Sequence, residues 1–139
     1  MIGESTEVDL DDIDVREAAQ LAPVVKMCNL IIQDAQRASA SDVHVEPSNR
    51  TVRVRFRVDG HLHDIETLPV DLLPNVVTRL KVMAGLLSYR VDIPQEGGVT
   101  LDHSEALDVR ISTFPTIRGE RVAVRLLPTE SDVRELGEL

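Results

Sequence analysis

Two stretches of the chain repeat their apolar residues at the spacing of a helix. In the first, residues 23–39, apolar side chains recur three and four positions apart and form one stripe. Pro23 suits a first helical position, and two further apolar residues widen the stripe, so we expect this helix to be buried on more than one side. The stripe contains Val24, Met27, Cys28, Ile31 and Ala35, and it is widened by Leu30 and Ile32.

The second stretch, residues 71–87, predicts a helix that Asp71 caps and that holds Pro74 in its first turn. Arg79 and Lys81 lie outside its expected core stripe. That stripe contains Leu73, Val76, Val77, Leu80, Met83, Ala84 and Leu87.

Much of the remaining chain alternates apolar and polar residues, which is the pattern of half-buried strands. Turn signals occur at residues 47–50, at Asp59-Gly60 and at Gly97-Gly98. We therefore expect strands at 42–46, at 51–58, directly after Gly60, and at about 98–103, 106–113 and 120–127.

The order is helix, three strands, helix, three strands and tail. It predicts an α+β domain whose sheet is mostly antiparallel, with about six strands and with two main helices packed on one face. The length of 139 residues fits one domain.

The strand expected at 51–58 carries three arginines on its polar face. Under the Asp59-Gly60 turn, Arg55 would oppose Asp64 and Arg53 would oppose Glu66, which would give two cross-strand ion pairs. One interpretation is a solvated, internally paired sheet face, and the other is a contact with a neighbouring subunit or domain.

Residues 108–127 place three more arginines on one face of a predicted hairpin. With a loop at 114–119, Arg110 would oppose Ala123 and Asp108 would oppose Arg125, so that Arg110, Arg121 and Arg125 gather on one surface. Guanidinium groups suit phosphate oxygens, so one interpretation is a face that contacts phosphate or a partner. The other, which spacing alone favours, is a solvated face neutralised by Asp108 and Glu120.

The formal net charge of −9 is concentrated at the ends of the chain. Seven acidic residues precede residue 18, and residues 18–129 contain 13 acidic and 13 basic residues. This balance, with only 2% aromatic residues, argues against general nucleic-acid binding. The acidic start does not resemble a signal peptide, and no apolar run approaches the length of a membrane span.

The residues that could carry other chemistry are few. The single cysteine, Cys28, lies in the first apolar stripe, which indicates a core residue and suits a reducing compartment. A metal site could be assembled from His44, Glu46, His61 and His63. The hairpin register instead predicts that His61 and His63 lie on the apolar face as neutral, hydrogen-bonded histidines, so we expect no metal.

Six segments of the sequence resemble, in the same order, motifs of the bacterial type II secretion and type IV pilus assembly ATPases. The segments are APVVKMCNLIIQDAQR (22–37), ASDVHVEP (40–47), VRFRVDGHLHDI (54–65), RLKVMAGL (79–86), IPQEGG (93–98) and DVRISTFPTIRGERVAVRLL (108–127). Two motifs depart from the family pattern: LSYRVD at 87–92 replaces DIAERR, and Gly98 replaces the arginine of PQDGR. These changes suggest a divergent subfamily or altered interdomain contacts.

The resemblance implies the PAS-like N-terminal domain that precedes the ATPase domain in these motors. Residues 22–128 would form this domain, residues 1–21 an acidic, flexible lead-in, and residues 129–139 the start of a linker to an ATPase domain. The phosphate-binding motif G-x-x-x-x-G-K-[ST] does not occur in the 139 residues, so we expect this chain alone not to hydrolyse ATP, and we expect its end to be a cut.

By the same resemblance, Arg110 and Arg125 match arginines that reach the phosphates of ATP bound by the adjoining ATPase domain, and Arg121 matches as well. ATP and Mg²⁺ would be bound by the parent protein. The implied partners are the ATPase domain of the same or a neighbouring subunit in a homo-hexamer, and components of the inner-membrane platform. The implied location is cytoplasmic, at the inner face of the bacterial inner membrane. The alternatives are a stand-alone adaptor, or a domain that senses a small ligand in its core.

Overall fold

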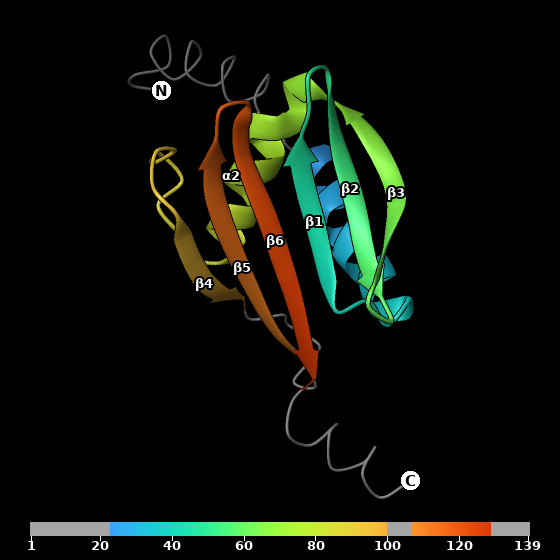
Figure 1. The fold of residues 1–139 in the computed structure, drawn as a ribbon. Coiled ribbons are helices and arrows are strands. Elements are labelled where there is room, and N and C mark those ends of the chain that lie inside the picture. Colours follow the sequence, from blue (N-terminus) through green and yellow to red (C-terminus); the bar gives the residue numbers. More distant parts are fainter. Residues whose placement is uncertain (1–22, 100–106, 129–139) are drawn as a thin grey trace, which may run out of the picture.

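The fold is a six-stranded antiparallel sheet with helices on one face, as seen in a computed structural model that describes residues 23–99 and 107–128 (Figure 1). Every neighbouring pair of strands is antiparallel, and the strand order is β3-β2-β1-β6-β5-β4. The α+β architecture expected from the sequence is therefore confirmed. The strands are β1 (Asp42–Pro47), β2 (Thr51–Val58), β3 (His61–Pro69), β4 (Gln95–Val99), β5 (Leu107–Thr116) and β6 (Gly119–Pro128).

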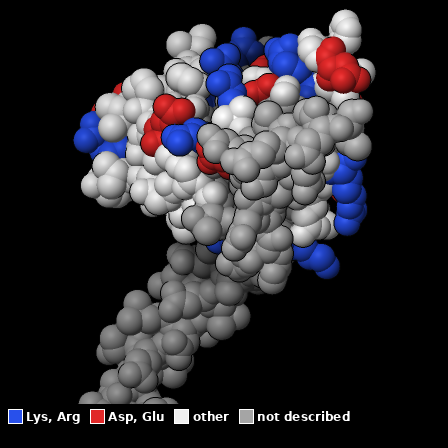
Figure 2. Space-filling view, turned by 90° about the horizontal axis from the view of Figure 1, so that it is seen from below, with Lys and Arg blue, Asp and Glu red and all other residues white. Residues whose placement is uncertain are grey.

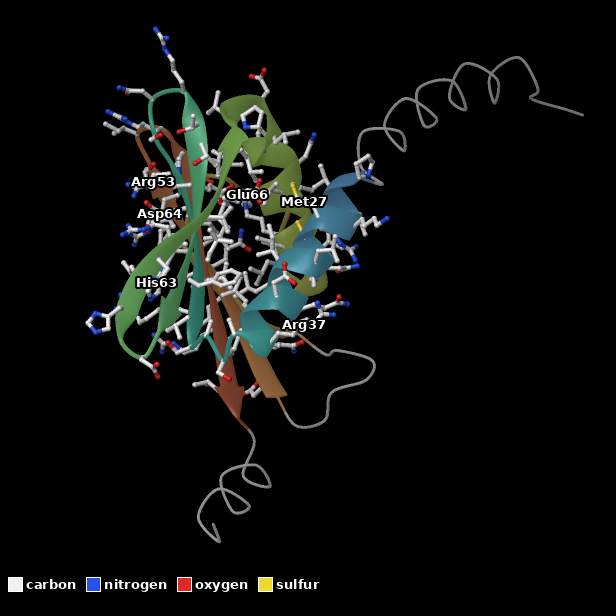
Figure 3. The ribbon with its side chains drawn as sticks, turned by 90° about the vertical axis from the view of Figure 1, so that its right-hand side faces the viewer. Met27, Arg37, Arg53, His63, Asp64 and Glu66 are labelled. Carbon is white, nitrogen blue, oxygen red and sulfur yellow. The ribbon has the colours of Figure 1, made fainter. Side chains whose placement is uncertain are left out.

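The helical layer consists of a helix at residues 23–37, a short 3₁₀ helix η1 (Val70–Leu72) and α2 (Leu73–Met83). Figures 1 and 3 show both longer helices on the same side of the sheet, so the opposite side has no helical cover in the described part of the chain. We call that uncovered side the open face. None of the described helices is long and apolar enough to cross a membrane.

The core lies between the sheet and the helices. It is built mainly from β-branched residues on alternate strand positions, because such residues pack well on a pleated surface. Cys28 belongs to it as predicted: its side chain is 2% exposed, and burial raises the pKa of its thiol to about 11. The strand residues of the core include Val43, Val45, Val52, Val54, Phe56, Val109, Ile111, Val122, Val124 and Leu126.

The first helix buries a narrower stripe of side chains than its sequence predicts. Val24, Cys28, Ile32 and Ala35 are buried, but Leu30 is 46% exposed. The helix also ends at residue 37 rather than 39, because Ser39 adopts a left-handed φ of 57° and Ala40 packs into the core. The expectation of burial on more than one side was therefore wrong.

The second helix is shorter than predicted. The chain passes through η1 before α2 begins at Leu73, and no side chain caps either helix, so Asp71 is not the cap. Pro74 lies in the first turn of α2, as expected. After Met83 the chain turns at Ala84-Gly85, where Gly85 has a φ of 68°, and Leu87 is exposed.

Gly97-Gly98, predicted as a turn, lies inside β4 instead. Gly97 pairs with Ile111 and faces the helices, where an added Cβ would lie 2.5 Å from the carbonyl oxygen of Ala84. The glycine is therefore required by the close approach of strand and helix end rather than by a turn. Residues 100–103 of the strand expected at 98–103, the lead-in expected at 1–21 and the linker expected at 129–139 lie outside the described residues.

Candidate functional site

The arginines of β5 and β6 lie on the open face because these strands alternate strictly. In β6, Val122, Val124 and Leu126 are buried, which turns Arg121 and Arg125 outward. Arg110 of β5 is the direct cross-strand partner of Arg125, and Arg121 is the partner of Phe114. The sequence therefore predicted the shared face of the three arginines correctly.

The register of that hairpin differs from the prediction by two residues. Pairing continues to Thr116 and Gly119, so the connection is the tight turn at Ile117-Arg118 rather than a loop at 114–119. Gly119 has a φ of 119°, and the side chain of Thr116 donates a hydrogen bond to its carbonyl. The shift moves Arg110 from Ala123 to Arg125 and so places two positive charges side by side.

A row of charged residues crosses four strands of the open face. Asp42 of β1 pairs with Arg57 of β2 on one side and with Arg125 of β6 on the other, and Arg110 of β5 follows. The next position in the row is Gly98, where the related motif carries arginine. Seen from below, basic side chains gather along the open side with acidic side chains among them (Figure 2).

Asp42 is the carboxylate at the centre of this row. Its Oδ1 lies 3.4 Å from Nε of Arg125, and its Oδ2 lies 3.8 Å from Nε of Arg57. The hydroxyl of Ser41 donates to Oδ2 at 2.8 Å. Arg110 has a separate, weaker contact, with its Nε 3.6 Å from Oδ2 of Asp108. Arg110 and Arg125 are therefore only partly neutralised, because each meets a carboxylate at a distance beyond that of a strong hydrogen bond.

Arg121 is held differently from the other two arginines. Its guanidinium carbon lies 5.2 Å from the centre of the Phe114 ring, which is the geometry of a cation–π contact. It is also separated from the row by the intervening position Ala123. The structure thus brings Arg110 and Arg125 together and leaves Arg121 at one side of them.

A second charged group lies on β1, β2 and β3. Arg53 donates two hydrogen bonds to Asp64, at 3.0 and 3.2 Å, and Nε of Arg55 lies 3.2 Å from the same carboxylate. Arg55 opposes Asp64 as predicted, but a bulge at Val54/Arg55 makes Arg53 oppose Thr67. The bulge moves Glu66 opposite Val54, so the predicted pair of Arg53 and Glu66 is wrong.

In Figure 3, Arg53 and Asp64 lie on the open side, whereas Glu66 lies toward the helices and Met27. Glu66 lines a shallow groove together with Met27 and Leu30 of the first helix. In this second charged group Arg53 and Arg55 both contact Asp64, and Nη1 of Arg55 lies 3.8 Å from Oε2 of Glu46. These contacts support the interpretation of a solvated, internally paired surface for this part of the face.

His44 lies between the two groups, opposite Arg55 on one side and Ala123 on the other. Partial burial is the main cause that lowers the pKa of its imidazole, and the positive charges of Arg57 and Arg121 add to it. Asp42 and Glu46 oppose these effects. A neutral His44 is therefore favoured among the arginines.

The four residues considered for a metal do not converge. His61 and His63 oppose Val58 and Phe56 as predicted, but both are exposed on the edge strand β3 rather than in or at the rim of the core. His44 and Glu46 lie on β1, on the open face. Within the described ranges, no group of three or more His, Cys, Asp or Glu residues is arranged to hold a metal ion.

A buried ion pair on the opposite side of β6 was missed by the sequence analysis. Lys81 of α2 is fully buried, Glu120 of β6 is 8% exposed, and Nζ of Lys81 lies 2.7 Å from Oε2 of Glu120. Glu120 therefore does not neutralise the arginine face, as one interpretation assumed, because it points to the helical side. The sequence did contain a signal for this pair. Glu120 lies two residues before Val122, so both side chains face the same side of the strand, and Lys81 follows Val77 by four residues, so both lie on the same face of the helix.

The same lysine ties down the loop after α2. Nζ of Lys81 also donates to the carbonyl oxygen of Arg90. The side-chain amide of Gln95 donates to the carbonyls of Leu87 and Arg90 at 2.9 and 3.2 Å, and its oxygen accepts from the Leu87 amide at 2.8 Å. Residues from three of the recognised motifs, RLKVMAGL, IPQEGG and the GER of the last hairpin, thus meet at one place and hold the divergent segment 87–92.

Comparison with known proteins agrees with the motifs. The sequence model of a family described as "Type II/IV secretion system protein" matches residues 17–139. Type II secretion system protein E of Xanthomonas campestris is 42% identical over 93% of this chain, and the type IV pilus assembly ATPase PilB of Myxococcus xanthus is 39% identical over 96%. Type II secretion system ATPase E of Vibrio cholerae is 39% identical over 89%.

The chain spans about a quarter of the length of these relatives: 23%, 25% and 25%. A solved structure, of the Legionella pneumophila ATPase DotB, superposes with a TM-score of 0.46 at 16% identity, over 76% of this chain and 32% of that one. That likeness is too weak to assign a fold or a function. The match to the family model, in contrast, covers residues 17–139. This chain therefore belongs to the type II/IV secretion system protein family, within the part that corresponds to the N-terminal domain of a secretion or pilus ATPase.

Proposed function

We propose that this domain regulates and assembles a secretion or pilus ATPase, and that Arg110 and Arg125 contact the phosphates of ATP bound by an adjoining ATPase domain. The observation that carries the proposal is the direct pairing of these two arginines on the open face. Their side chains are 52% and 66% exposed, so a ligand can reach both. Arg121, four residues before Arg125 on the same face of β6, would take a subsidiary part.

The chemistry of phosphoryl transfer explains what the pair would do. Charge builds on the oxygens of the transferring phosphate, and guanidinium groups aimed at them stabilise that charge. Two partly neutralised arginines on neighbouring strands repel one another, so a polyphosphate placed between them reduces this repulsion as well. The ATP, the Mg²⁺ and the phosphate-binding loop would belong to the ATPase domain.

The wider setting follows from the family. The domain would pack against ATPase domains in a homo-hexameric ring at the cytoplasmic face of the bacterial inner membrane, next to the platform components of the secretion or pilus system. In that ring the open face would turn toward a nucleotide held by the same or a neighbouring subunit.

One void in the described core is too small to hold a sensed ligand. The void among Cys28, Ile32, Val43, Val76 and Leu80 has a volume of about 10 Å³, which is the size of a single water site. The remaining alternative, an adaptor without nucleotide chemistry, is an outcome of the test below.

The test is the ATPase rate of the full-length protein with Arg110→Ala, Arg125→Ala and both. We expect the double variant to lose at least about tenfold in hydrolysis rate, since each arginine stabilises transition-state charge. Arg37→Ala is the matched control, because Arg37 is an exposed arginine on the helical side whose contact is Asp34 in its own helix. Hydrolysis at the parental rate in the double variant would overturn the proposal and favour the adaptor.

A further inference from the structure

Asp42 is nearly enclosed although it lies on the open face. Its side chain is 13% exposed, compared with 66% for its neighbour Arg125. Three groups surround the carboxylate: the Ser41 hydroxyl at 2.8 Å, Arg125 at 3.4 Å and Arg57 at 3.8 Å. A carboxylate placed so deeply among basic groups needs at least one of them to remain in contact.

The two arginines are not held equally. Arg57 is 38% exposed, and its Nη1 also donates to the carbonyl oxygen of Gly60 at 3.0 Å, so it is fixed at two points. For Arg125, Asp42 is the contact found among the described residues, at a distance typical of a weak hydrogen bond. Arg125 is therefore the partner that can leave at low cost.

The departure of Arg125 does not leave Asp42 without partners. The Ser41 hydroxyl and Arg57 stay beside Oδ2, whereas Arg125 contacts Oδ1. A buried carboxylate stripped of its partners is strongly destabilising, but one that keeps a hydrogen bond and a cation is not. The arrangement thus holds Arg125 beside Arg110 and still permits its release.

We propose that Asp42 is a positioning residue for Arg125: it holds the guanidinium next to Arg110 when no phosphate is bound, and an incoming polyphosphate displaces it. Arg57 and Ser41 keep Asp42 paired after the exchange. This inference rests on the proposed function, because it assumes that Arg125 receives phosphate. It assigns a role to the aspartate of the ASDVHVEP motif, beyond its place in the fold.

The experiment is a titration of the 139-residue chain with inorganic tripolyphosphate at low ionic strength, followed by the NMR signals of the arginine Nε–H groups. In Asp42→Asn the competing charge is lost, so we expect the Kd to fall by about three- to tenfold. The matched control is Asp64→Asn, which makes the same charge change on the same face, next to Arg53 and Arg55. The control is expected to lower the Kd by less than twofold.

A second variant tests whether Arg57 keeps Asp42 paired when Arg125 leaves, and here the Kd should change in the opposite direction. In Arg57→Gln, Asp42 depends on Arg125 for its counter-ion, so we expect the Kd for tripolyphosphate to rise by about threefold relative to Arg53→Gln. Arg53 is the control because it belongs to the same strand and its removal makes the same charge change. This comparison holds even if Asp42→Asn weakens the sheet.

The outcomes separate this inference from the function on which it rests. The role of Asp42 is overturned if Asp42→Asn and Asp64→Asn have equal Kd values, or if Arg57→Gln and Arg53→Gln do. In that case a loss of binding in Arg125→Gln still leaves the proposed function standing. Unchanged binding in an Arg110→Gln, Arg125→Gln double variant overturns both. Two results are expected. On adding tripolyphosphate, the Nε–H signal of Arg125 should lose the part of its chemical shift that depends on Asp42. The Kd should fall in Asp42→Asn and rise in Arg57→Gln.

Discussion

The two faces of β6 use charge in opposite ways. On the helical face, Glu120 meets a fully buried Lys81 at 2.7 Å. On the open face, Arg125 is 66% exposed and reaches its carboxylate, Asp42, at 3.4 Å. Successive side chains of the strand alternate between these two environments, so one strand carries a fixed ion pair on one face and, five residues later, an exchangeable pair on the other.

The difference is one of solvent access. Lys81 is fully buried and Glu120 is 8% exposed, so removal of either member leaves a largely buried charge without its partner. On the open face, water and neighbouring side chains take the place of a lost partner, and the pairs contribute little to stability. The helical face therefore suits a structural role and the open face suits ligand exchange.

The largest expected effect comes from breaking the buried pair. Lys81→Met should lower the free energy of unfolding by about 3–5 kcal/mol, because Glu120 would remain buried without a cation and the Arg90 carbonyl would keep only the Gln95 amide as a donor. Urea denaturation followed by circular dichroism measures this. The double variant Lys81→Met, Glu120→Leu should regain most of the loss. A single-variant loss below about 1 kcal/mol would contradict the difference between the faces.

The second effect comes from two adjacent glycines of β4, one on each face. Gly97→Ala should destabilise the domain by about 1–3 kcal/mol, because its Cβ would meet the Ala84 carbonyl oxygen at 2.5 Å. Gly98→Ala is the control: its Cβ would lie 3.9 Å from the Val109 carbonyl oxygen, so stability should change by less than about 0.5 kcal/mol. Equal thermal shifts for the two variants would show that the end of α2 does not press on β4.

A smaller effect is expected for the open face itself. Arg53→Ala removes a two-bond contact with Asp64, whose side chain is 67% exposed, so it should lower the free energy of unfolding by about 0.2–1 kcal/mol. The difference from the parent should shrink in 1 M salt, where the screening length is ~3 Å. A loss as large as that of Lys81→Met would remove the distinction drawn between the faces.

The smallest effect concerns His44. Its pKa is lower in the folded than in the unfolded chain, chiefly because of partial burial, so the neutral form stabilises the fold. That contribution is complete above the unfolded pKa of ~6.5 and is lost as the pH falls through the folded value. The urea midpoint should therefore decrease slightly on acidification below about pH 6.5. His44→Gln should flatten this step, and His61→Gln, at an exposed position, should leave it in place.

The sequence predicted the faces of strands better than their partners. Alternation placed Arg110, Arg121 and Arg125 on one surface, and the Asp59-Gly60 signal placed Arg55 opposite Asp64, as the structure confirms. Pro115 and Gly119 suggested a loop at 114–119, yet both lie in paired strands, so the register moved by two residues. A shift of two residues preserves faces and changes partners, which is why the surface was predicted and the contact between Arg110 and Arg125 was not.

The bulge in β2 and β3 shows the same limit. It moved Glu66 away from Arg53 and toward the helical side, and no local signal marks an extra residue within the strand. Similarly, Lys81 was expected outside the core stripe of its helix, although it follows Val77 by four residues and is fully buried. Residue type was a poorer guide here than position, because Glu120 was available to pair with it.

The sequence by itself determined the element order, the α+β class, the core-facing side of β2, β5 and β6, and the family, because these depend on periodicity and motifs within short windows. The tertiary structure decided which residues meet: Asp42 with Arg57 and Arg125, Lys81 with Glu120, and Gly97 with the end of α2. Such contacts join segments up to 83 residues apart, as for Asp42 and Arg125. They depend on strand register and on the packing of helix against sheet, which the whole chain fixes together.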